Sequence, residues 1–297
     1  MRWLLIVLGV IGIALQLGTP APAEGEALQA RTLGERAYKL YVPPRDGQLP
    51  LVIALHGGGG NGTQFAQSSG LLDKAAKEGF VLALPEGSAG PLRLQTFNAG
   101  GCCAYAMNRK IDDVGFVRAL IDEQVKGGRV DPKRIYVVGL SNGAMLAQRV
   151  AIAIGDRIAG AVIYVGALFG NEPAPVAPVP MLILNAEKDD RVPVAGGFSS
   201  TVGRAQGMAF EPSRYAATFW AAANRCATSP VRSETADFVL ERWSGCARGA
   251  DVDFYVTRGA GHGWPGRAPA RPGAAGRDTG RVDGTDLMWA FFAAHHR

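Results

Sequence analysis

Short apolar runs, separated by segments of helical pattern, constrain the fold of this 297-residue chain more than any other feature. A short continuous apolar run is typical of a strand buried on both faces of a sheet. Because strand and helix alternate, we predict an α/β fold, a mainly parallel sheet with helices on both faces. The runs lie at 51–55, 80–84, 135–138, 160–165 and 180–184, a further strand is expected at 252–256, and helices are expected at 70–78, 114–125, 142–154 and 286–295.

Other segments depart from this order. Residues 37–42 alternate weakly and precede Pro43-Pro44, which predicts an edge strand. Three stretches, 87–110, 173–180 and 265–284, lack regular patterning, and loops of such length are usually functional or mobile.

The N-terminus has the three parts of a secretory signal: a basic start, an apolar run at 3–17, and an Ala-Pro-Ala triplet that ends at Ala23. The run is short for a membrane span, so an uncleaved anchor is the weaker alternative. We expect a signal peptide at 1–23 and a single α/β domain at 24–297, with no stable membrane anchor after cleavage. Extracellular and periplasmic locations both stay open.

Composition narrows the class of protein further. With 47% hydrophobic and 19% charged residues, the chain can bury a full core. The formal net charge of +5 is not gathered into a basic stripe, so no nucleic acid partner is expected.

The four cysteines lie in the exported part, where disulfides are the default. We expect Cys226 and Cys246 to pair. Cys102 and Cys103 are adjacent and either form a vicinal disulfide or stay as buried thiols. Their spacing lacks the two separated C-x-x-C pairs of a zinc site, so no metal is expected.

Residues 139–143 read Gly-Leu-Ser-Asn-Gly, a G-x-S-x-G motif with a buried strand before it and a helix after it. This is the context of a nucleophile elbow in the α/β-hydrolase fold, where the turn exposes the serine hydroxyl. Ser141 is therefore the candidate nucleophile. A glycine-rich turn without catalytic meaning is the alternative.

A serine hydroxyl needs a base to take its proton, and the chain has only four histidines. His295 and His296 lie at the C-terminus, and His56 precedes the serine, against the Ser, acid, His order of this fold. His262 follows a predicted strand late in the chain and is the candidate base.

The acid should follow a strand between serine and histidine. Residues 185–193 follow the strand at 180–184 and contain Asp189, Asp190 and Glu187. We choose Asp189, but spacing alone cannot separate it from its neighbour. Its expected role is to hold the imidazole in the correct tautomer.

His56 and four glycines directly follow a buried strand and match the oxyanion loops of the HGGG type. We expect the N–H of Gly58, with Gly57 or Gly59 as alternatives, to act with the N–H of Asn142. His56 is expected to bond nearby backbone.

The same loop also reads as the G-x-G-x-x-G of a dinucleotide-binding oxidoreductase, through Gly57, Gly59 and Gly62 with Glu86 beyond. That hypothesis leaves Ser141 and His262 without a role. A non-catalytic carbohydrate-binding protein is a third class.

Together these motifs resemble the secreted poly(3-hydroxybutyrate) depolymerase and feruloyl esterase group, in the carbohydrate esterase branch of the α/β-hydrolases. In that family an HGTxDxxVP segment carries the acid, which here assigns Asp189 over Asp190, although Asn-Ala-Glu replaces His-Gly-Thr. The matching segments are LYVP at 40–43, LHGGGGN at 55–61, NAGGCC at 98–103, DDVGF at 112–116, RIYVVGLSNGAML at 134–146 and GAGHGWPG at 259–266.

The resemblance implies a serine esterase that works through an acyl-enzyme and needs no cofactor. Its substrates would be feruloyl or acetyl esters of plant polysaccharide, or hydroxyalkanoate esters. Trp264, Phe97 and Tyr105 are candidates for the wall of an acyl pocket, and ordinary packing beneath a loop is the alternative for each.

Overall fold

The computed structural model describes residues 28–199, 201–267 and 281–297. The expected signal peptide and much of the irregular stretch at 265–284 lie outside these residues. The strands are β1 (Gln29–Leu33), β2 (Arg36–Tyr41), β3 (Leu49–Leu55), β4 (Val81–Pro85), β5 (Ser88–Ala89), β6 (Gln95–Thr96), β7 (Val130–Leu140), β8 (Gly160–Tyr164), β9 (Met181–Ala186), β10 (Val231–Glu234), β11 (Phe238–Trp243) and β12 (Val252–Thr257).

The helices alternate with the central strands along the chain. They are α1 (Gly62–Ser68), α2 (Leu71–Glu78), α3 (Ala104–Asn108), α4 (Asp113–Lys126), α5 (Asn142–Ile154), α6 (Ser213–Ala223) and α7 (Gly284–Ala293), with short 3₁₀ turns at Gly155–Arg157, Gly203–Ala205 and Ala247–Gly249.

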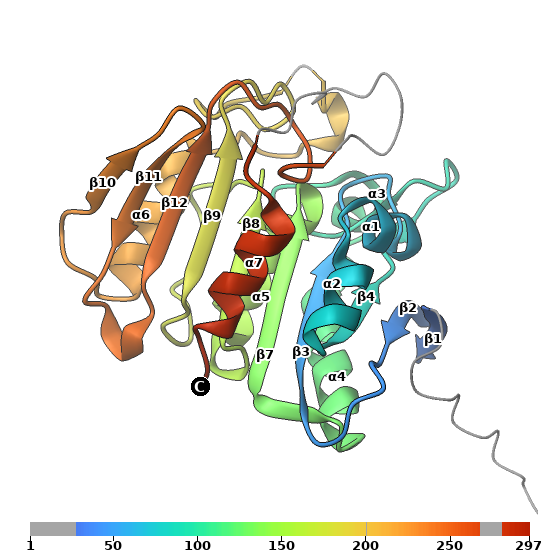
Figure 1. Cartoon of the computed structure of the whole chain (residues 1–297). Coiled ribbons are helices and arrows are strands. Elements are labelled where there is room, and N and C mark those ends of the chain that lie inside the picture. The colour runs from blue at the N-terminus through green and yellow to red at the C-terminus, as the bar shows by residue number, and fades with distance from the viewer. Residues whose placement is uncertain (1–27, 200, 268–280) are drawn as a thin grey trace, which may run out of the picture.

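Ten strands form one sheet in the order β1-β2-β4-β3-β7-β8-β9-β12-β11-β10 (Figure 1). The strands from β4 to β12 in this order run parallel to one another. An antiparallel pair extends each edge of this parallel centre, β1 with β2 and β11 with β10. The predicted α/β-hydrolase architecture is thereby confirmed.

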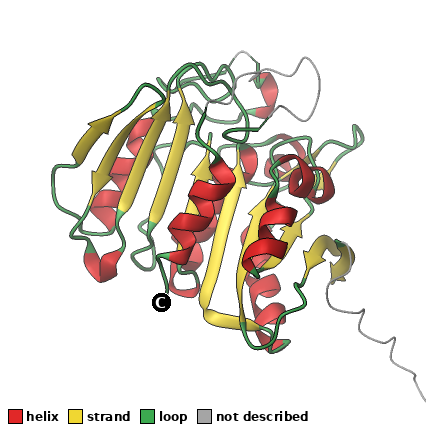
Figure 2. Ribbon diagram, in the orientation of Figure 1, coloured by secondary structure: helices red, strands yellow, loops and turns green. Residues whose placement is uncertain are grey.

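Helices cover both faces of the sheet, with α2 and α7 in front and α5 and α6 behind it in Figure 2. The alternation of side chains along β3 shows how one strand serves two cores. Leu51, Ile53 and Leu55 pack with residues of α4, α5 and α6. Val52 and Ala54 pack with residues of α1, α2 and α7. This burial on both faces explains the continuous apolar runs.

The prediction of an edge strand at 37–42 is wrong. β2 lies between β1 and β4, because the chain before it folds back at Gly34 and pairs antiparallel with it. Pro43 and Pro44 follow the last paired residue, so they interrupt no hydrogen bond of the ladder.

Among residues 28–199, 201–267 and 281–297, no helix is long and apolar enough to cross a membrane.

Candidate active site

Ser141 sits on a sharp turn between β7 and α5. Its backbone has φ 56° and ψ −120°, a conformation that L-residues rarely adopt, and its N–H donates to the carbonyl of Tyr164 at 2.9 Å. The turn needs the glycines on either side. A Cβ on Gly139 would lie 2.3 Å from the Gly143 carbonyl oxygen, and one on Gly143 would lie 2.2 Å from the Leu55 carbonyl oxygen. The motif is therefore a steric requirement of a nucleophile elbow.

His262 and Asp189 lie against each other. Nδ1 of His262 is 2.8 Å from Oδ2 of Asp189, and both side chains are buried. The other carboxylate oxygen of Asp189 accepts the backbone N–H groups of Arg191 and Val192, each at 2.8 Å. Because three donors hold the carboxylate, it is oriented to keep the Nδ1 proton on the imidazole and to leave Nε2 as the basic atom.

These three residues come from neighbouring parallel strands. Ser141 follows β7, Asp189 follows β9 and His262 follows β12, and β8 stands between the first two. The carboxyl ends of these strands meet at the upper edge of the sheet in Figure 1. Parallel pairing therefore brings together side chains that lie far apart in the sequence.

The acid loop is residues 185–193, and its first three residues, which depart from the family pattern, link it to its surroundings. Asn185 is buried, and its side-chain N–H₂ donates to the carbonyl of Gly166 at 3.1 Å. The carboxylate of Glu187 accepts the N–H of Gly259 at 2.8 Å, in the loop that carries His262. Glu187, the third candidate acid, therefore supports the histidine loop rather than the imidazole. Asp190 is exposed beside its buried neighbour.

The glycine loop after β3 runs directly along the elbow. A Cβ on Gly57 would lie 3.6 Å from the Cβ of Ser141, and one on Gly58 would lie 3.7 Å from the Cβ of Asn142. The N–H of Gly59 already donates to the carbonyl of Gln95 at 2.7 Å. The N–H of Gly58 donates to no other described residue, and that of Asn142 is in the first turn of α5, where helices leave N–H groups unpaired. The N–H of Gly57 likewise donates to no described residue, so Gly57 and Gly58 both stay candidates to act with Asn142.

His56 holds the glycine loop in place through both of its ring nitrogens. Its Nε2 accepts the N–H of Gly87 at 3.1 Å, so Nδ1 carries the proton and donates to the carbonyl of Gly57 at 2.8 Å. Burial lowers the pKa of His56 below its ordinary value and keeps the ring neutral. Glu86, the acid of the dinucleotide hypothesis, accepts the N–H of Gly62 at 3.1 Å, so its carboxylate is used within the loop.

The side chain of Asn142 fixes the NAGGCC loop, a role that the sequence analysis missed. Its amide oxygen accepts the N–H of Phe97 at 2.7 Å, and its amide nitrogen donates to the carbonyl of Phe97 at 2.9 Å. Buried Asp113, from the DDVGF motif, accepts the N–H of Asn98 and pairs with Arg36, each at 2.7 Å. The two motifs are therefore parts of one hydrogen-bonded support, and their closeness in the sequence, at 98–103 and 112–116, was the available signal.

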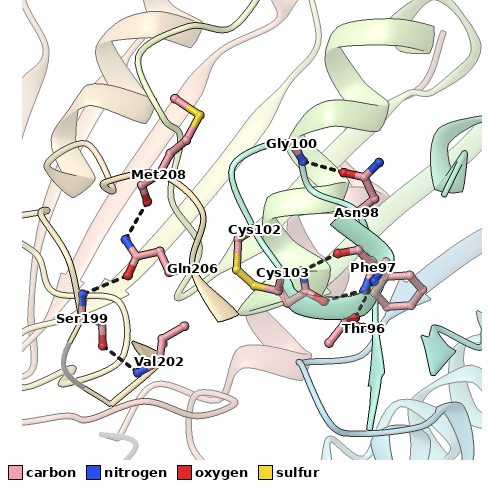
Figure 3. The surroundings of a disulfide bond; sticks show 12 residues. Thr96, Phe97, Asn98, Gly100, Cys102, Cys103, Ser199, Val202, Gln206 and Met208 are labelled. Atoms are coloured by element: carbon pink, nitrogen blue, oxygen red, sulfur yellow. Dashed lines mark hydrogen bonds between the residues drawn. A yellow bond between two sulfur atoms is a disulfide. The ribbon is translucent and has the colours of Figure 1, made fainter. Parts of the chain in front are cut away.

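Figure 3 shows the Cys102–Cys103 pair at the end of this loop, where the two cysteines form a vicinal disulfide. Both cysteines are buried and pack in one apolar cluster with Met145 and Val192. Met145 lies one turn after Ser141, and Val192 lies in the acid loop. Cys226 and Cys246 form the second disulfide, with an S–S distance of 2.00 Å.

The three residues predicted as candidates for the wall of an acyl pocket lie in different surroundings. Trp264 is buried, packs edge-on against Tyr164 with ring centroids 4.8 Å apart, and donates its indole N–H to Thr285 at 2.9 Å. Phe97 is fully buried in the core. Both correspond to the alternative of ordinary packing, because an accessible pocket wall requires an exposed face. Tyr105 is half-buried and packs against Gly90.

Residues 36–209 match the family described as esterase PHB depolymerase, which is more than half of the chain. The chain belongs to this family. Membership confirms the resemblance and places the chain among the carboxylic ester hydrolases of the serine class, within the α/β-hydrolases. Membership in an esterase family favours the esterase interpretation of the glycine loop over the dinucleotide-binding one.

Individual relatives agree with this family. Feruloyl esterase B of Piromyces equi is 30% identical over 222 residues, which is 73% of this chain and 40% of that protein. Putative esterase NocK of Nocardia uniformis subsp. tsuyamanensis is 29% identical over 277 residues, 86% of this chain and 78% of that one. This chain therefore spans less than half of the first relative and most of the second. The solved acetyl xylan esterase from Aspergillus awamori shares the fold, with a TM-score of 0.62 at 13% identity over 90% of this chain and 99% of that one.

Proposed function

We propose that this chain is an exported serine esterase with Ser141 as nucleophile, His262 as general base and Asp189 as the orienting acid. The observation that carries the proposal is the contact of 2.8 Å between His262 and Asp189, at the edge of the sheet where the elbow holds Ser141. The proposal includes a signal peptide at 1–23 and a single catalytic domain at 24–297.

The reaction follows from this arrangement. The Ser141 hydroxyl attacks the ester carbonyl carbon while Nε2 of His262 takes its proton. The carbonyl oxygen becomes an oxyanion, which the N–H groups of Gly58 and Asn142 stabilise. His262 then returns the proton to the leaving alcohol, and water releases the acid from Ser141 by the same relay. The residues named here are sufficient for each of these steps.

The substrate class is drawn from the relatives. A feruloyl esterase lies among them, an acetylxylan esterase of Coprinopsis cinerea is 26% identical over 161 residues, and the family carries the name of a polyester depolymerase. We propose feruloyl or acetyl esters of plant polysaccharide as the substrates, with hydroxyalkanoate esters as the second class. Ser141 followed by Asn142 favours the feruloyl side.

Hydrolysis of p-nitrophenyl acetate and butyrate by the purified protein tests the proposal, together with labelling by a fluorophosphonate and mapping of the labelled peptide. We expect wild type to turn over and to label at Ser141. Ser141→Ala should lower kcat by about 10⁴-fold or more and abolish labelling. The matched control is Ser233→Ala, an exposed serine on β10. Labelling at another serine, or full activity of Ser141→Ala, would overturn the assignment.

A further inference from the structure

A cavity of about 420 Å³ lies beside α5, outside the set of residues that the proposed reaction uses. It is bounded by the NAGGCC loop, the segment that follows β8 and Met208. Its walls are mostly apolar, and its size falls within the range of small-molecule sites. The residues of the walls that matter here are Val114, Met145, Leu168, Phe169 and Met208.

Among the described residues that line this cavity, Arg149 is the only cationic one. Its side chain is half-buried, and one N–H donates to the carbonyl of Asn98 at 2.6 Å. No described carboxylate forms an ion pair with Arg149. None of the described residues accepts its other N–H groups. A partly desolvated guanidinium without a counter-ion favours an anionic ligand.

Glu172 also lines the cavity, but its carboxylate is already engaged. One oxygen accepts the N–H of Phe169 at 2.5 Å and the other accepts the N–H of Gly170 at 3.0 Å. The backbone therefore satisfies Glu172, while Arg149 keeps N–H donors that no described residue accepts.

The cavity lies close behind the candidate active site. Met145 follows Ser141 by one helical turn, a rise of about 6 Å. Gly100 and Gly101 line the cavity and follow Phe97, which Asn142 holds by two hydrogen bonds. Figure 3 shows Asn98, Gly100 and Met208 around the Cys102–Cys103 pair, which packs against Met145.

We propose that this cavity binds a small organic carboxylate, with its apolar body against Met145, Leu168 and Phe169 and its carboxylate on Arg149. A planar carboxylate matches the fork of one guanidinium, whereas a phosphate dianion would require further cations, which the described lining does not supply. The carboxylate is either a free acid of the kind that ester hydrolysis releases or a charged end of the ester itself. The link to the ester rests on the proposed function.

Binding is tested first, without any turnover. Calorimetric titration of cinnamate into Ser141→Ala measures affinity, with cinnamamide as the uncharged match. We expect cinnamate to bind at least tenfold more tightly than the amide. Arg149→Gln should remove this preference, and Ala153→Phe, which fills the cavity and keeps the charge, should weaken binding of both. Absence of cinnamate binding, or equal binding of acid and amide, overturns the proposal even if the esterase assignment holds.

Kinetics then identify the source of the carboxylate. We compare KM for p-nitrophenyl hemisuccinate with KM for p-nitrophenyl butyrate in wild type and in Arg149→Gln. An increase of about tenfold in this ratio assigns the site to a charged end of the substrate. An unchanged ratio with retained cinnamate binding assigns it to free acid. If Arg149→Gln changes kcat for both esters and leaves cinnamate binding intact, Arg149 acts only through Asn98 and the proposal is wrong.

Discussion

Asp189 and Asp190 are chemically identical neighbours with different surroundings. Asp189 is buried, faces His262 and accepts two backbone N–H groups, whereas Asp190 is exposed. Spacing in the sequence left both open, and only the family motif favoured the first. The geometry agrees with that motif because the turn at 189–192 directs one carboxylate inward.

Removal of the charge on each aspartate tests this difference. Asp189→Asn keeps the shape of the side chain but favours the wrong tautomer of His262, so we expect kcat for p-nitrophenyl butyrate to fall by about 10⁴-fold. Asp190→Asn is the matched control and should lower kcat by less than about threefold, because an exposed substitution leaves the imidazole untouched. A larger loss in Asp190→Asn than in Asp189→Asn would show that the register of the acid loop is wrong.

At the scale of elements, the unit β7, elbow and α5 was predicted closely, whereas the edges of the sheet were not. A buried strand, a glycine-rich turn and an amphipathic helix are local patterns. β10 is exposed along its whole length and carries no apolar run. α6 was missed although Ser213, Ala216, Ala217, Trp220 and Ala221 are its buried residues, and their helical spacing was a usable signal.

Gly143, in the first turn of α5, packs the unit of β7, elbow and α5 against β3. A Cβ there would lie 2.2 Å from the Leu55 carbonyl oxygen, and neither backbone can move without opening the sheet. We expect Gly143→Ala to destabilise the protein by about 3 kcal/mol or more, measured by urea unfolding. Gly160→Ala is the matched control, since its nearest neighbour, an atom of the Phe291 ring, would be at an ordinary 3.5 Å. Equal stability of the two variants would contradict the close approach at the elbow.

At the scale of the whole molecule, His56 couples stability to pH. Burial lowers its pKa in the folded state below the value of 6.5 that the unfolded chain keeps. Below pH 6.5 the unfolded state therefore binds more protons than the folded state, and stability falls as pH decreases. Protonation would also remove the Nε2 acceptor that holds Gly87.

Unfolding free energies at pH 7.5 and pH 5.5 measure this coupling. His56→Gln keeps an acceptor and donors but does not titrate, so its loss of stability between these pH values should be smaller than that of wild type, by up to about 1.4 kcal/mol. His296→Gln is the control at an exposed position and should lose as much as wild type. If His56→Gln also loses as much, another group carries the acid sensitivity.

The sequence by itself determined the α/β class, the strand-turn-helix unit at Ser141, and the loops that carry His262 and the candidate acid Asp189. Those features depend on local sequence patterns and on the rule that the carboxyl ends of parallel strands lie at the same edge of a sheet. Tertiary structure bound the N–H of Gly59 to the carbonyl of Gln95, which leaves the N–H groups of Gly57 and Gly58 as candidates, and it placed Phe97 and Trp264 in the core. These outcomes depend on contacts between segments far apart in the sequence, where a shift of one residue reverses the direction of a side chain.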